Sequence, residues 1–175
     1  TPSGMSLKVI DLANNSTRSL SLPCAVSGSM AIDTQNIYVT CRGQYDAQTD
    51  SWINGTIHKI PKSGASSSLL VTLSGRANTI FAYNGDLYWG EFFTYQKNTA
   101  SIRRMSANGG TVQILATGLK VARDLTVQDG TVFWVEAGGG TGFVRKVSTQ
   151  GTSFQTLKQT TQEANTIAVD ANFIY

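Results

Sequence analysis

Apolar and polar residues alternate along most of this chain of 175 residues, and polar turns rich in Asn, Asp and Gly separate the apolar runs. Alternation with a period of two is typical of β-strands. Asn, Asp and Gly tolerate the positive φ angles that tight hairpin turns require. Since no segment shows helical periodicity, the pattern predicts an all-β fold built from antiparallel hairpins.

The hairpin pattern repeats along the chain. Segments 77–89, 122–134 and 164–175 align without gaps, and each holds an apolar strand, a polar turn and a second strand that carries aromatic residues. A looser fourth copy covers 29–39. The gap-free copies begin 45 and 42 residues apart, a period typical of the four-stranded blade of a β-propeller.

A second hairpin follows each copy, so the repeat unit has four antiparallel strands, which we name A, B, C and D in chain order. Strand C is predicted at 56–60, 101–105 and 143–147, and strand D at 69–71, 112–115 and 154–157. These assignments predict three complete blades near 25–75, 76–120 and 121–162.

The two ends of the chain match the two halves of a further blade. Residues 6–10 match strand C and 18–22 match strand D, whereas 164–175 match an A–B hairpin. Asn14 falls where other copies carry Gly, so we expect it to adopt the left-handed conformation. A propeller closes its ring with such an offset, and we therefore expect 5–22 and 164–175 to form one split blade.

The strands add up to about four blades, the small extreme for a propeller. Three arrangements fit this count: a closed four-blade ring, a part of a six- to eight-bladed ring, or a half of an eight-bladed ring made by two copies. The sequence stops at Tyr175 on the second strand of a hairpin. We therefore expect a piece of a larger ring, or a chain that completes its ring by self-association.

Several short motifs resemble the YWTD and NHL-like group of β-propellers. They are AVD at 168–170 with IY at 174–175, LYWGE at 87–91, and the KSG at 62–64 that follows a strand C. The Thr-Asp of the YWTD consensus is replaced here, for example by Gly90-Glu91. The resemblance covers nearly the whole chain and implies the propeller fold.

Charge and cysteine content narrow the classes of partner and compartment. The net charge is only +3, without a concentrated basic run, and no apolar run could span a membrane, so we expect neither nucleic acid nor membrane as a partner. The repeat register places Cys24 and Cys41 near one end of a blade, which favours a disulfide over two reduced thiols. A disulfide indicates an extracellular or periplasmic location.

The register also gathers polar residues at one rim, because the start of strand A and the end of strand B lie together in an antiparallel pair. The ligand-binding candidates there are Asn78, Glu91, Arg123, Glu136 and Asn165. Their oxygens would suit calcium, and gluconolactonase- and paraoxonase-like propellers, which the fold resembles broadly, hold a metal in such a ring. The alternative is a structural network in which Arg76 and Arg123 pair with the two glutamates.

A long loop between strands B and C of the first blade, 42–54, supplies two more candidates, Tyr45 and Trp52. Aromatic residues on a loop above a rigid scaffold are typical of peptide or carbohydrate recognition. The alternative is local packing onto the neighbouring blade.

The sequence contains no catalytic signature. His58, the one histidine, lies mid-strand at the position of Arg103 and Arg145, and we expect these residues to form a solvated, outward-facing row. No Gly-x-Ser-x-Gly motif occurs. We therefore expect a secreted, non-enzymatic binding or assembly module that recognises a protein or glycan through its loop face and associates with itself or with another propeller fragment. The alternative is a metal-assisted hydrolase or lyase that uses Glu91 or Glu136 at the channel mouth.

Overall fold

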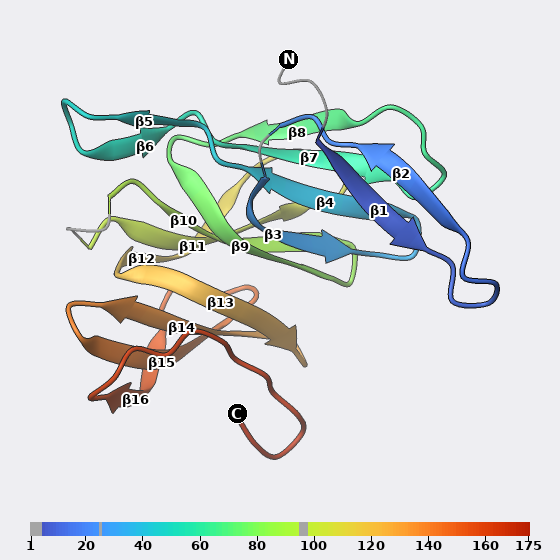
Figure 1. The fold of residues 1–175 in the computed structure, drawn as a ribbon. Helices are drawn as coiled ribbons and strands as arrows, with labels where there is room; N and C mark the ends of the chain where they lie inside the picture. Colours follow the sequence, from blue (N-terminus) through green and yellow to red (C-terminus); the bar gives the residue numbers. More distant parts are fainter. Residues whose placement is uncertain (1–4, 25, 95–97) are drawn as a thin grey trace.

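The computed structural model describes residues 5–24, 26–94 and 98–175, without the side chains of 26–28. Within these residues it contains sixteen β-strands and no helix (Figure 1). Most strands form three antiparallel sheets of four strands each. The predicted all-β architecture of four-stranded propeller blades is therefore confirmed.

Each complete blade follows the predicted A–B–C–D order. Blade 1 consists of β3 (Val26–Ile32), β4 (Asn36–Cys41), β7 (Thr56–Pro61) and β8 (Ser68–Thr72). Blade 2 consists of β9 (Arg76–Tyr83), β10 (Asp86–Phe92), β11 (Ala100–Ser106) and β12 (Gln113–Leu119). Blade 3 consists of β13 (Val121–Gln128), β14 (Thr131–Gly138), β15 (Thr141–Ser148) and β16 (Gln155–Thr160).

Two further hairpins lie outside these sheets. β1 (Ser6–Ile10) and β2 (Thr17–Ser21) occupy the predicted C and D positions at the start of the chain and form a sheet of their own. β5 (Gln44–Asp46) and β6 (Ser51–Ile53) form a small hairpin between β4 and β7, where the sequence predicted only a long loop. We call residues 44–53 the surface hairpin.

Apolar side chains fill the spaces between successive sheets. Leu7 and Val9 of β1 pack against Val39 and Ile60 of blade 1. A second cluster joins blades 1 and 2, and a third joins blades 2 and 3. The sheets are therefore stacked in chain order, from β1–β2 to blade 3, as neighbouring propeller blades are (Figure 1).

The last residues form the predicted A–B hairpin only in part. Val169 and Ile174 form a single antiparallel bridge, and Ala168 and Tyr175 exchange two backbone hydrogen bonds. The N- and C-terminal segments lie at opposite ends of the stack in Figure 1, and among the described residues no sheet joins 164–175 to β1. The structure is thus a partial propeller, and the closing of a split blade stays a prediction.

The turn between β1 and β2 differs from the prediction by one residue. Asn15, with a φ of 58°, adopts the left-handed conformation, and the prediction for Asn14 was wrong. The Asn14 side chain instead accepts a hydrogen bond from the Ser16 N–H at 2.8 Å. This local bond ties Asn14 to the turn backbone and leaves the positive φ to its neighbour.

Candidate functional site

Glu91, the last residue but one of β10, places its carboxylate in the protein interior. Its side chain is fully buried, and it accepts hydrogen bonds from the Gly75 N–H at 3.0 Å and from the Trp89 indole at 3.3 Å. Arg103 of β11 lies 3.3 Å away and supplies the compensating positive charge. A buried charge needs both a partner and hydrogen bonds, and Glu91 has both.

Glu136 repeats this arrangement in blade 3. It accepts from the Lys120 N–H at 3.0 Å and from the Trp134 indole at 2.7 Å, and it pairs with Arg145 at 3.1 Å. Burial raises the pKa of the Glu136 carboxyl, and the indole hydrogen bond and the Arg145 charge oppose that rise. We call each such set a Trp–Glu–Arg clasp; each clasp ties the end of strand B to the segment that leads into strand A.

The two clasps correct the predicted pairing. Arg103 and Arg145 of strand C pair with the glutamates, and the predicted partners Arg76 and Arg123 of strand A do not. Cross-strand register explains this: Trp89 lies directly opposite Arg103, so the guanidinium reaches the carboxylate two residues further on. The predicted solvated row was also wrong, because the side chains of Arg103 and Arg145 are only 20% and 14% exposed.

Asn78 and Arg123 occupy β-bulges at equivalent points of β9 and β13. Ala77 and Thr79 pair with adjacent residues of β10, so Asn78 is the extra residue, and Arg123 is extra in the same way in β13. A bulge redirects one side chain away from the regular alternation. The Asn78 amide donates to the Ala122 carbonyl at 3.5 Å, and Arg123 lies 3.8 Å from Glu163. Both candidates are half-buried, whereas Asn165 at the same register position is exposed.

Hydrogen bonds between successive A strands form a feature that the sequence analysis missed. The Asp124 carboxylate accepts from the Thr166 hydroxyl at 3.0 Å and from the Ile167 N–H at 3.1 Å. In blade 1, the Ser29 hydroxyl accepts from the Ile80 N–H at 3.2 Å. Ser29 and Asp124 hold the same register position, so a comparison of the aligned repeats could have identified them.

In blade 1, the rim carries a disulfide. Cys24 and Cys41 are bonded, with their Cα atoms 5.8 Å apart, which confirms the predicted pair. Cys41 lies at the register position of Glu91 and Glu136, and only 3% of it is exposed. A pocket of about 400 Å³ opens beside this bond, and we call it the rim pocket. Its lining residues are Pro23, Cys24, Cys41, Arg42, Gly43, Gln44, Asn54 and Thr56.

The surface hairpin adjoins the rim pocket and holds the two remaining candidates. Trp52 is half-buried, with the guanidinium groups of Arg76 and Arg42 lying 4.7 Å and 5.5 Å from its ring. Its backbone N–H donates to the Phe93 carbonyl of blade 2 at 2.7 Å. Tyr45 is 52% exposed, and its hydroxyl donates to Asp50 at 2.6 Å. Trp52 thus anchors the hairpin to blade 2, and Tyr45 lies on the surface.

His58 occupies the position that arginine holds in the two clasps. It is half-buried, and its Nε2 lies 3.1 Å from the Thr56 hydroxyl. Burial lowers the pKa of His58, which favours the neutral imidazole. The predicted outward-facing orientation therefore fits His58 only in part.

Among residues 5–24, 26–94 and 98–175 no group of three or more His, Cys, Asp or Glu side chains could hold a metal ion. Calcium at the channel mouth stays a prediction. The same part of the chain has no helix long and apolar enough to cross a membrane.

Comparison with solved structures supports the fold. A chain in the crystal structure of a nidogen/laminin complex superposes with a TM-score of 0.74 at 17% identity; the match covers 97% of the present chain and 62% of that chain. The nidogen propeller of that complex is of the YWTD type. The computationally designed protein Ika4 matches with a TM-score of 0.57 at 12% identity, over 88% of the present chain and 85% of its own. The designed protein Ika8 matches with a TM-score of 0.54 at 14% identity, over 89% and 44%. No family model and no curated protein matches the chain.

Proposed function

We propose that this chain, which has the fold of a YWTD-like β-propeller, is a non-enzymatic binding module that recognises a protein partner through the surface hairpin and the rim pocket. The observation that carries the proposal is the anchoring of the surface hairpin. Trp52 and Arg76 fix it to blade 2, while Tyr45 remains 52% exposed. An exposed aromatic residue on a rigid support loses little entropy on binding, which is why Tyr is frequent at interface hot spots.

The rim pocket beside Tyr45 adds a concave surface. Arg42, which is exposed, and the amide groups of Gln44 and Asn54 line it, so it offers hydrogen-bond donors for a carboxylate or carbonyl group of a partner. A chain of similar fold occurs in the nidogen/laminin complex, which supports a protein partner. The disulfide supports an extracellular or periplasmic location, since such bonds persist in oxidising compartments.

The carboxylates that an enzyme would use at the rim are already bound to other groups of the protein. Glu91 and Glu136 are fully buried, and each is bound to an arginine and an indole. A general base must reach a substrate proton, and buried, ion-paired carboxylates do not. This geometry favours the binding module over the hydrolase or lyase alternative.

Photo-crosslinking at Tyr45 tests the proposal. The chain with a photoreactive residue at position 45 is expected to crosslink to a protein in material from its natural source. An excess of unlabelled wild type should abolish the crosslink, and the Tyr45→Ala variant should compete at least about tenfold less well. Leu157→Ala, at an exposed position of β16, is the matched control that should compete like wild type. Two outcomes would contradict a protein-binding rim. The first is competition by Tyr45→Ala that equals competition by wild type. The second is the absence of any protein crosslink together with binding of wild type to a glycan array, where Tyr45→Ala does not bind.

A further inference from the structure

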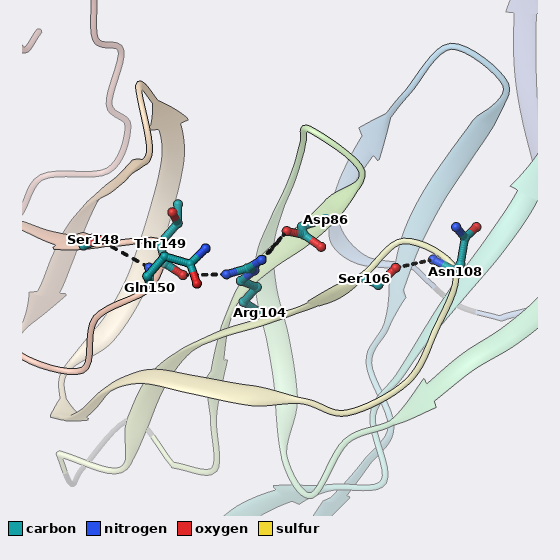
Figure 2. A network of polar contacts seen from close by, with 7 residues as sticks. All are labelled: Asp86, Arg104, Ser106, Asn108, Ser148, Thr149 and Gln150. Atoms are coloured by element: carbon teal, nitrogen blue, oxygen red, sulfur yellow. Dashed lines mark hydrogen bonds and ion pairs between the residues drawn. The ribbon is translucent and has the colours of Figure 1, made fainter.

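Most arginines of this chain bind groups of the chain itself. Arg104 is an example: its guanidinium lies 2.7 Å from the Asp86 carboxylate, and it donates to the Thr149 carbonyl of blade 3 at 2.8 Å (Figure 2). Other arginines bind a carboxylate or a backbone carbonyl in the same way: Arg18, Arg103, Arg123 and Arg145. The fold thus provides an acceptor for each of these cations.

Arg42, at the rim pocket, differs from them. Its side chain is exposed, and among the described residues its guanidinium has no hydrogen-bond or ion-pair partner. The guanidinium lies 5.5 Å from the centre of the Trp52 ring, against which Arg76 of blade 2 also packs. A contact with an aromatic ring restrains a guanidinium and leaves its N–H groups able to bind an anion.

The acidic side chains of the surface hairpin bind other groups. The Asp46 carboxylate accepts from the Gln48 N–H at 2.9 Å and from the Thr49 hydroxyl at 2.8 Å. The Asp50 carboxylate accepts from the Tyr45 hydroxyl at 2.6 Å. None of the ion pairs among the described residues includes Arg42. The rim pocket therefore carries a positive charge that the described part of the chain does not neutralise.

The register position of Arg42 shows that the fold does not require a cation there. Arg42 follows the disulfide cysteine at the end of strand B. The residues that follow the two clasp glutamates are Phe92 and Ala137, which are 1% and 2% exposed. Packing between blades is thus satisfied by an apolar residue at this position, whereas blade 1 places an exposed arginine there.

From these observations we propose that the rim pocket binds an acidic side chain, Asp or Glu, of the partner protein. The inference rests on the proposed function and names the group that the pocket recognises. The carboxylate accepts two N–H groups of Arg42, the geometry in which arginine binds carboxylates most strongly. The side-chain amides of Gln44 and Asn54, which line the same pocket, supply further donors.

The shape of the surface favours a side chain over the carboxylate at a chain end. Gln44 belongs to both the rim pocket and the surface hairpin, so the two form one continuous surface. A partner that contacts Tyr45 therefore extends past the pocket, and the bound carboxylate belongs to a residue within its segment. Pro23 and the disulfide supply an apolar wall for the methylene groups of that residue.

Competition for the Tyr45 crosslink tests the inference with the natural partner. Arg42→Glu should compete at least about tenfold less well than wild type, because it places a second carboxylate against that of the partner. Arg42→Lys keeps the charge and loses the paired N–H groups, so it should lie between the two. Lys158→Glu, which makes the same charge change at an exposed position of β16, is the matched control that should compete like wild type.

A peptide of known composition tests the pocket directly. Hexaglutamate with an acetylated N-terminus and an amidated C-terminus carries carboxylates only on its side chains. At about millimolar concentration it should shift the indole N–H resonance of Trp52, which the spectrum of Trp52→Phe identifies. Hexaglutamine with the same blocked ends should leave this resonance in place, and Arg42→Glu should bind hexaglutamate at least about tenfold more weakly than wild type.

The two experiments separate the carboxylate pocket from the protein-binding rim. Near-ultraviolet circular dichroism verifies that each variant is folded. A protein crosslink for which folded Arg42→Glu competes like wild type overturns the carboxylate pocket and leaves the protein-binding rim standing. Hexaglutamate that leaves Trp52 unshifted, or binds wild type and folded Arg42→Glu equally, also overturns the pocket. Hexaglutamate binding that requires Arg42, without any protein crosslink, supports the pocket and contradicts the rim.

Discussion

Blade 1 and the two blades after it fasten the same point of the rim with different chemistry. In blades 2 and 3, Glu91 and Glu136 bind the backbone N–H of Gly75 and Lys120. Each donor lies two residues before the alanine that pairs with its glutamate. In blade 1, Cys41 takes the place of the glutamate and pairs with Val26. Cys24 lies two residues before Val26. The disulfide therefore joins the same two points that the carboxylate joins elsewhere.

The rest of the clasp changes together with this residue. Val39 replaces the tryptophan and His58 replaces the arginine. A carboxylate buried at this point needs a cation and an indole donor, whereas a disulfide needs neither. All three blades thus contain a contact between the end of strand B and the segment before strand A. The residues around that contact differ according to whether a carboxylate or a disulfide makes it.

Removing the carboxylate should have the largest effect of the changes considered. Glu136→Ala leaves Arg145, whose side chain is 14% exposed, without its counter-charge, and it leaves the Lys120 N–H and the Trp134 indole without an acceptor. Breaking such a buried pair costs about 3–5 kcal/mol of the free energy of unfolding. Urea denaturation measures this change.

The matched control for that variant is Glu163→Ala, which removes a carboxylate 3.8 Å from Arg123 at a site where both side chains are about one-third exposed. A pair of that kind contributes about 0–1 kcal/mol. Similar losses in the two variants would show that the Glu136 clasp is no more important than a surface ion pair.

The fold could be predicted from the sequence because each hairpin repeat shows a local pattern of turn and aromatic residues, as in 77–89 and 122–134. The repeat register also placed Glu91 and Glu136 at one rim, and Cys24 and Cys41 near one end of a blade. The prediction assigned Arg76 and Arg123 to the glutamates in place of Arg103 and Arg145. Strand alternation and the bulges at Asn78 and Arg123 decide which cation reaches each carboxylate. A bulge depends on how two strands pair, so the sequence of one strand does not reveal it. The surface hairpin escaped prediction because its three-residue strands are too short to show a pattern.

Removing the disulfide should have the second largest effect. Cys24 and Cys41 are separated by 17 residues, and the chain-entropy model gives about 3 kcal/mol for a loop near this length. The Cys24→Ser/Cys41→Ser variant should lose about this much stability in urea denaturation. Treatment with a dithiol reductant should lower the stability of wild type to that of the double variant and leave the double variant unchanged. Unchanged stability of reduced wild type would mean that the rim of blade 1 is held by other contacts.

Protonation of His58 should have the smallest effect, and it concerns blade 1 alone, because arginines hold the equivalent position in the other two blades. Burial lowers the pKa of His58 below 6.5 in the folded state, so the unfolded chain binds the proton more readily. The histidine therefore contributes its full stability above pH 6.5 and loses it as the pH falls through the folded pKa.

The raised pKa of Glu136 acts in the opposite direction on acidification, so the comparison must be made against His58→Gln, in which Glu136 is unchanged. Between pH 7 and 5 the denaturation midpoint of wild type should fall further than that of His58→Gln. Since His58 is the one histidine in the sequence, a single imidazole resonance reports its titration by NMR; a folded-state pKa at or above 6.5 would show that the blade 1 position accepts a cation as the clasps do.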